Sequence, residues 1–254
     1  MAQLGYGFAV LVVACGLGSS MALAADMAMK APVKAVPYAP SPSWTGLYVG
    51  GHLGGGWVDE TATFVSSTSI NLIDPLGTSY PIDHSGFLGG VQAGYNYQIQ
   101  NWVIGIAGDF SWTSAKVDTV TASLLVPGAQ VHTQAKTDWY ATATGRVGYA
   151  FGNLLAYGKG GAAWIHSVHG GFADFGAAGI VPFSDVTTTR AGWTVGVGLE
   201  WAFAPHWSVF GEYNYMDFGT RTYTFTNLAD GGSTSNFDVK TSVSLVKAGV
   251  NYRF

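Results

Sequence analysis

The chain of 254 residues is long enough for one domain of ordinary size, and its net charge of −4 offers no basic surface for nucleic acid. Apolar residues make up 48 % of the chain and charged residues only 10 %, whereas soluble domains carry about 25 % charged residues. After residue 25 no run of about 18 apolar residues occurs, so a helical membrane span is excluded there. A soluble β-protein and a membrane β-barrel both remain open.

Residues 1–24 have the features of a secretory signal peptide. An apolar core from Phe8 to Cys15 precedes Ala22-Leu23-Ala24, the small residues that a signal peptidase needs. The start departs from the usual pattern, because no Lys or Arg precedes Phe8. An N-terminal membrane anchor and a lipoprotein cleavage before Cys15 are the alternatives. The short apolar core and the A-x-A site favour a cleaved leader, which would remove the only cysteine.

Residues 25–43 contain four prolines and two lysines. Proline lacks a backbone donor and favours an extended, unpaired chain. We therefore expect a periplasmic tether here, followed by a barrel domain at residues 44–254. A solvated linker is the simpler interpretation, and contact with peptidoglycan is the alternative.

From residue 45 onward, segments of about ten residues place apolar side chains at every second position, which predicts β-strands. The predicted strands span 45–58, 85–98, 102–112, 137–151, 154–166, 190–203 and 207–217, and an eighth ends at Phe254. Leu47, Val49 and Leu53 share one face of the first strand, and Tyr48 and His52 lie on the other. In general one face is rich in Trp, Tyr, Phe, Val and Leu, and the other carries Gly, Thr, Gln, Asn and the charges.

The predicted connections alternate in length. Those after the second, fourth and sixth strands have about two to four residues, including a Gly152-Asn153 hairpin turn, and the others have roughly 18 to 26 residues. Short periplasmic turns and long extracellular loops are the rule in outer-membrane barrels. The sequence therefore predicts an all-β fold, an eight-stranded antiparallel up-and-down transmembrane β-barrel.

The tryptophans support this interpretation, because they collect at the two ends of the predicted strands. Trp prefers the membrane–water interface, where its ring is in an apolar medium and its N–H finds a partner. We expect an interface girdle of Trp57, Trp112, Trp139, Trp164 and Trp193 at the long-loop end, and of Trp44, Trp102, Trp201 and Trp207 at the short-turn end.

Six charged residues within the predicted strands fall on the inward face. They are Asp109, Arg146, Lys159, Glu200, Glu212 and Lys247, three of each sign. Counted from the Gly152-Asn153 turn, Arg146 and Lys159 are directly opposite, so acids must compensate them. Buried charges persist only when paired, so we expect a charge network in the lumen. Filling and holding the barrel is favoured over a gate, because eight strands enclose little more than side chains.

Other patterns predict no chemistry, and we expect no catalytic residue, no metal site and no cofactor. His166 and His169 resemble half a metal site, but an i, i+3 pair on a strand points to opposite faces, and solvated loop residues are the favoured interpretation. The stretch Gly158–Ala163 resembles a dinucleotide fingerprint without the helix that it requires. The nucleophile motif G-x-S-x-G is absent. His52 could face the lumen, but no partner can be placed for it.

Several stretches together resemble the small porin-like outer-membrane β-barrel family of alphaproteobacteria, the outer-membrane immunogenic proteins. They are ADMAMKAP, WTGLYVGGHLGGGW, DWYATATGRVGYAF, GWTVGVGLEWAF, WSVFGEYNYMDFG and the ending VKAGVNYRF. The resemblance implies an eight-stranded outer-membrane barrel of a Gram-negative cell, abundant in the envelope and a surface antigen. Tyr252 and the terminal Phe254 are similar to the end signal that the barrel-assembly machinery reads. Some relatives bind haem, but no His or Met here is placed as an axial ligand.

We therefore expect a surface-exposed structural protein of the outer membrane, in contact with lipid, without catalysis. A narrow channel for small solutes is the first alternative. Binding of a host surface or an extracellular ligand, haem included, through the long loops is the second. Loop two at residues 113–136 and loop three at residues 167–189 would carry most of that specificity.

Overall fold

The computed structural model describes residues 42–68, 74–124, 126–226 and 232–254, and these residues are almost all in β-strands. Eight long strands are β1 (Gly46–Ser67), β3 (His84–Ile99), β4 (Trp102–Thr113), β6 (Gln130–Phe151), β7 (Leu154–Asp174), β9 (Val186–Ala202), β10 (Trp207–Thr226) and β11 (Thr234–Arg253). Three short strands, β2 (Ser79–Pro81), β5 (Lys116–Ala122) and β8 (Ile180–Pro182), and a 3-10 turn, η1 (Gly176–Ala178), lie in the connections. In the part of the chain that is described, no helix is long and apolar enough to cross a membrane.

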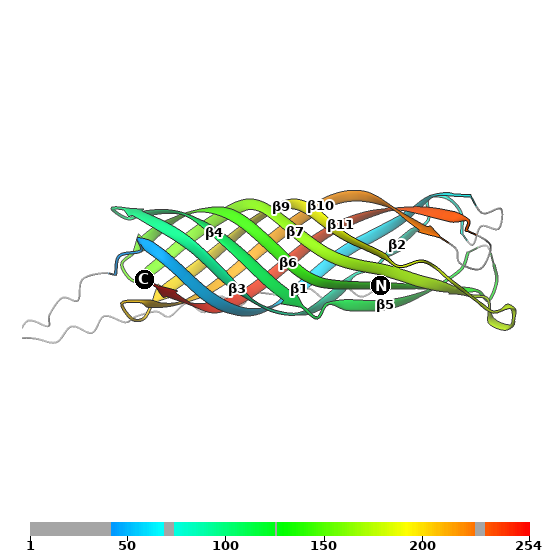
Figure 1. Cartoon of the computed structure of the whole chain (residues 1–254), viewed down its shortest axis with the longest axis horizontal. Helices are drawn as coiled ribbons and strands as arrows, with labels where there is room; N and C mark the ends of the chain where they lie inside the picture. The colour runs from blue at the N-terminus through cyan, green and yellow to red at the C-terminus, as the bar shows by residue number, and fades with distance from the viewer. Residues whose placement is uncertain (1–41, 69–73, 125, 227–231) are drawn as a thin grey trace, which may run out of the picture. The chain divides into compact units, whose positions relative to one another are not determined.

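The eight long strands form a closed antiparallel ring (Figure 1). Their order is β6-β4-β3-β1-β11-β10-β9-β7, and β7 pairs back to β6. The first and last strands, β1 and β11, pair from Tyr48 opposite Arg253 to Ser67 opposite Ser235. Because every ring strand has a partner on both sides, the ring leaves no long open edge.

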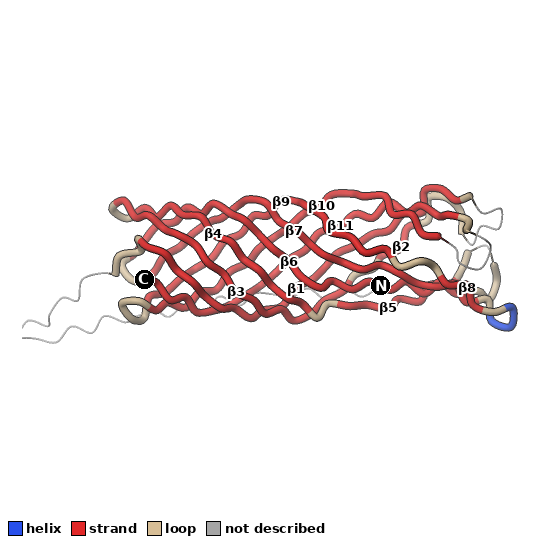
Figure 2. The backbone as a smooth tube through the Cα atoms, in the orientation of Figure 1, coloured by secondary structure: helices blue, strands red, loops and turns tan. Residues whose placement is uncertain are grey.

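The connections sort to opposite ends of this ring (Figure 2). At one end, called the short-turn end, lie the turns after β3, β6 and β9 and the C-terminal residue, whose N–H donates to Leu47 O at 3.0 Å. The hairpin at Gly152-Asn153 is the predicted two-residue turn, and Gly152 has a φ of +64° that favours glycine. The other end, called the long-loop end, holds β2, β5, η1 and β8.

The ring is inverted relative to a soluble protein, since its outer face is the apolar one. Outward side chains such as Leu53, Phe87 and Ile106 are 74 %, 83 % and 68 % exposed. The alternate side chains face inward and are buried, among them His52 and Gln92. The predicted assignment of the two faces is therefore confirmed along the ring strands.

Inside the ring, apolar and polar groups alternate in layers along the axis. The layer at the short-turn end contains Trp44, Val103, Ala150, Leu155, Tyr157 and Ala202. The middle layer contains Val58, Leu88, Tyr140, Ala163, Ile165, Met216, Phe218, Val243 and Leu245. The layer at the long-loop end contains Ala62, Ile82, Ala135, Tyr223 and Val239. The buried charges lie between these layers.

The strands are longer than predicted, and the long loops are correspondingly shorter. β1 continues to Ser67, β6 begins at Gln130, β7 ends at Asp174 and β10 ends at Thr226. Much of the predicted loop three is therefore strand. These outer halves carry Thr, Ser and Gly on both faces, so their alternation is too weak to read from the sequence.

Candidate functional site

Four of the six predicted lumen charges form one compact cluster between the short-turn and middle layers. Lys247 Nζ lies 2.5 Å from Asp109 Oδ1 and 3.2 Å from Glu212 Oε1. Lys159 Nζ lies 3.2 Å from Asp109 Oδ2 and 2.7 Å from Glu212 Oε1. Each lysine thus contacts both acids, and the formal charge of the cluster is zero.

Hydroxyl and amide groups complete the coordination of the two carboxylates. Thr142 Oγ1 donates to Asp109 at 2.9 Å, and Tyr157 OH donates to Glu212 at 2.9 Å. The amide of Asn214 donates to the other oxygen of Glu212 at 2.7 Å. A buried ion pair is tolerated when its remaining lone pairs are satisfied, and these contacts meet that condition.

The other two predicted charges form a second pair toward the short-turn end. Arg146 Nη2 donates to Glu200 Oε2 at 3.1 Å, and the guanidinium lies over the rings of Tyr48 and Tyr157 at 5.0 and 4.6 Å from their centroids. Ser208 Oγ donates to Glu200 Oε1 at 2.6 Å. The register places Arg146 opposite Lys159, as the hairpin count predicts, and each base meets a different acid.

This charge network is shielded from solvent. All six side chains belong to residues that are 7 % exposed or less. Layers of buried apolar residues lie on both sides of it along the axis. The arrangement can hold strands together across the ring, since Asp109 on β4 meets Lys159 on β7 and Lys247 on β11.

The tryptophans occupy the outer face with one exception. Trp57, Trp102, Trp112, Trp164, Trp193, Trp201 and Trp207 are exposed, and Trp139 is half-buried between Phe110 and His166. Trp44 lies inside the ring, so its place in the outward girdle is corrected. Its Nε1 donates to Gly152 O at 3.2 Å and the Arg253 guanidinium lies over its ring. Strands also continue past Trp57, Trp139, Trp164 and Trp193, so these four lie within strands rather than at their ends.

A second polar layer was missed from the sequence, because the predicted strands end before Glu60 and His169. Glu60 Oε2 lies 3.2 Å from His169 Nε2, and Thr241 donates to Glu60 Oε1 at 2.7 Å. Arg190 donates to Thr241 Oγ1 at 2.8 Å. His169 is 3 % exposed, so the interpretation as a solvated loop residue is wrong. Continuing the alternation of 154–166 by three residues places His169 on the inward face.

His166 lies on the outer face of β7, stacked on Trp139 and hydrogen-bonded to Thr189. The two histidines thus point to opposite faces, as their spacing predicts. In the described ranges, no group of three or more His, Cys, Asp or Glu residues could hold a metal. The stretch Gly158–Ala163 is continuous β7 strand without a following helix.

His52 has a partner that the sequence did not show. Its Nε2 lies 2.8 Å from Ser111 Oγ, and both residues are buried inside the ring. A nucleophilic serine needs a substrate to reach it, together with a base held by a third group. The pair is shielded inside the ring wall, where it joins β1 to β4 across Gly90 of the intervening strand β3.

At the long-loop end, a connection is tied down by Asp74. Its carboxylate accepts from Tyr80 OH and, at 2.5 Å, from the backbone N–H of Leu124. Burial, and then the hydrogen bond to Asp74, raise the pKa of the Tyr80 phenol above its ordinary value. The connection between β1 and β2 is thereby joined to the one between β5 and β6.

A closed ring with an apolar outer face and paired charges inside defines the class of outer-membrane β-barrel proteins. Residues 12–254 match the family described as "Outer membrane protein beta-barrel domain". The chain belongs to this family and is a protein of the outer membrane.

Similar proteins agree with this membership. The chain is 32 % identical over 252 residues to the 31 kDa outer-membrane immunogenic protein of Brucella melitensis, covering 96 % of this chain and 98 % of the relative. It is 27 % identical to the 22 kDa outer membrane protein of Rhizobium leguminosarum bv. viciae, over 89 % of this chain and 83 % of the relative. These relatives bear out the resemblance to the alphaproteobacterial family.

Among solved structures, the outer membrane protease OmpT from Escherichia coli is similar with a TM-score of 0.51. The likeness covers 85 % of this chain and 99 % of that one at 9 % sequence identity. At this identity the likeness concerns the fold alone.

Proposed function

We propose that this chain is a structural surface protein whose eight-stranded ring crosses the outer membrane as an up-and-down barrel. The outer face supports this, because its exposed leucines, valines and aromatics fit hydrocarbon and would be costly in water. The long-loop end then lies outside the cell and the short turns in the periplasm. The names of the Brucella relatives, outer-membrane immunogenic proteins, agree with a surface antigen.

The barrel interior acts as a structural plug, without catalysis and without an open pore. The charge network supports this part of the proposal, since it joins β4, β7 and β11 at the centre of the barrel. Each of its charges has at least one partner of opposite sign. Nothing in this arrangement presents a reactive group to a substrate.

Planar-bilayer conductance separates the plugged barrel from the narrow channel. The folded chain is expected to insert without stepwise current at moderate voltage. A reproducible open state would overturn the proposal that the interior is plugged. To show that such a current comes from this protein, a variant that blocks the lumen should abolish it.

We also propose that residues 1–24 are removed as a signal peptide and that residues 25–43 form a periplasmic tether. Nearly all of these residues lie outside the described ranges.

The assembly machinery would read the end of β11, where Tyr252 and Phe254 pack edge to face with ring centroids 5.2 Å apart. Deleting Phe254 is expected to reduce the heat-modifiable, folded band in outer-membrane fractions. Unchanged assembly would contradict this role.

Surface proteolysis of whole cells tests the topology. Cleavage is expected only in the connections at the long-loop end, and cleavage at Gly152-Asn153 would reverse the orientation. A small peptide inserted after Gly152 serves as an internal control, because it should be cut only in opened cells.

A further inference from the structure

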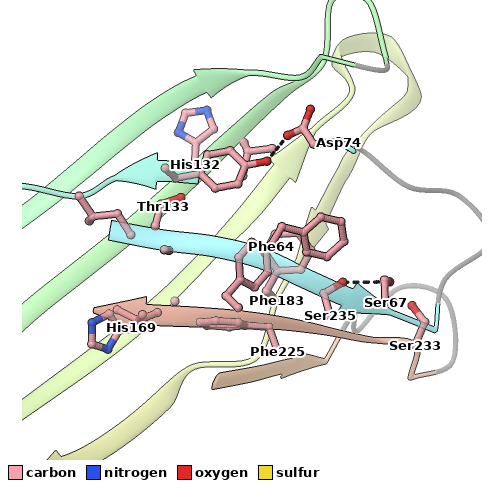
Figure 3. A pocket seen from close by; sticks show the side chains of 17 residues that line it. Phe64, Ser67, Asp74, His132, Thr133, His169, Phe183, Phe225, Ser233 and Ser235 are labelled. Carbon is pink, nitrogen blue, oxygen red and sulfur yellow. Dashed lines mark hydrogen bonds between the residues drawn. The ribbon is translucent and has the colours of Figure 1, made fainter. Parts of the chain in front are cut away.

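The long-loop end of the barrel interior contains a cavity of about 110 Å³ (Figure 3). Its walls come from several ring strands and from the connections that fold over them. Phe64 and Phe237 lie with ring centroids 5.1 Å apart, and Phe225 meets Phe237 edge to face at 5.7 Å. Tyr80 meets the same Phe237 ring edge to face at 6.1 Å. The cavity is thus lined by aromatic rings.

A polar pair lies beside the cavity on the side of the short-turn end. His169 lies in the cavity wall, and it pairs with Glu60, the inward residue of β1 that precedes the lining residue Ala62. The middle apolar layer comes next along the axis. A molecule that enters from the long-loop end therefore meets this pair and then the apolar layer.

Several polar groups of the wall are already engaged by the protein. Asp74 accepts hydrogen bonds from Tyr80 and from the backbone of Leu124, and the Ser67 hydroxyl is 3.2 Å from the Ser235 hydroxyl. Nδ1 of His169 is a buried wall atom without a hydrogen-bond partner. A single such atom does not repay the water that a charged or strongly polar ligand would lose. An apolar ligand would restore the packing contacts that an empty cavity lacks.

We propose that this cavity binds one small aromatic hydrocarbon ring from the extracellular side. An apolar cavity of roughly 150 Å³ in another protein binds benzene, so this volume is suited to a single ring and is far too small for a macrocycle such as haem. Rings in edge-to-face and offset contact favour an aromatic occupant over a saturated one. The inference goes beyond the structural role, and the side of entry rests on the proposed topology.

The test uses the full chain folded in detergent and fluorobenzene as the probe, followed by fluorine NMR. Wild type is expected to show a saturable shift above the linear partition into micelles. Ala62→Leu places a larger side chain into the cavity and should weaken binding at least tenfold. The matched control is Ala191→Leu on the exposed outer face of β9, which should bind as wild type does.

Four outcomes would overturn the proposal. Equal saturable binding in wild type and Ala62→Leu would place the site elsewhere, and a linear response in both would mean micelle partition only. Fluorocyclohexane binding as tightly as fluorobenzene would contradict the aromatic class. Crystals of the wild type soaked with bromobenzene need no variant: anomalous density between Phe64 and Phe225 supports the site, and its absence at a saturating dose refutes it.

Discussion

Replacing Glu212 by Gln removes one of the two acids that hold Lys159 and Lys247, and it should destabilise the barrel strongly. The amide keeps the volume and can still accept from Tyr157, so the main change is electrostatic. The four-residue cluster goes from a formal charge of zero to +1, with only Asp109 left for two buried ammonium groups. Removing one partner of a buried pair costs about 3–5 kcal/mol, so we expect a loss in this range.

The assay is reversible urea unfolding of the protein in lipid vesicles, followed by tryptophan fluorescence, with heat-modifiable gel mobility to confirm folding. The matched control is Asp138→Asn, because Asp138 pairs with Lys136 at 2.6 Å on the surface. That pair is exposed, so its loss should cost no more than about 1 kcal/mol. The double variant Glu212→Gln/Lys247→Met restores a neutral cluster and should recover most of the lost stability.

If Glu212→Gln lowers the free energy of unfolding by less than about 1 kcal/mol, the charge network stabilises the barrel no more than a surface ion pair does. The proposed structural role of the network would then be wrong. Conductance provides a second criterion. If the variant conducts strongly while it remains folded, the cluster is a gate rather than a support.

Three further predictions follow from the packing. Trp44→Ala should lower the free energy of unfolding by about 3–5 kcal/mol, because the side chain is fully buried. Trp207→Ala on the outer face should lower it clearly less, and the midpoints of urea unfolding compare the two variants. In single-tryptophan proteins, brominated lipids should quench Trp207 and leave Trp44 nearly unaffected, and equal quenching would contradict the inward position of Trp44. Gly90→Ala should impair folding, since a Cβ there would meet a backbone oxygen at 2.1 Å, whereas Gly211→Ala, with nothing within 4 Å, should fold normally by gel mobility.

The strand faces and the strand neighbours could be predicted because the alternation of side chains and the length of a turn are local properties. Lys159 is opposite Arg146 because a two-residue hairpin fixes the register between them. Which acid each base meets depends on how the ring closes. Lys247 and Asp109 lie on strands that are far apart in the sequence, and neither strand alone contains the information that pairs them.

Two features escaped prediction for different physical reasons. Trp44 precedes the first residue of β1, so strand alternation does not decide its side, and the ring buries it beneath Arg253. Glu60 and His169 lie in the outer halves of β1 and β7, where the outward positions of β1 include Asp59, Thr61 and Thr63. There the sequence loses the apolar-out pattern that lipid imposes, although backbone pairing continues.

The extension of the strands has a consequence for recognition by antibodies. A strand needs about 9–11 residues to cross the hydrocarbon, but β1 and β6 each have 22. In the proposed orientation the barrel would rise beyond the bilayer as a hydrogen-bonded collar, and an antibody would meet mainly this collar. Antibodies raised against the folded protein are expected to recognise residues brought together from neighbouring strands, and to lose binding when the protein is boiled in detergent.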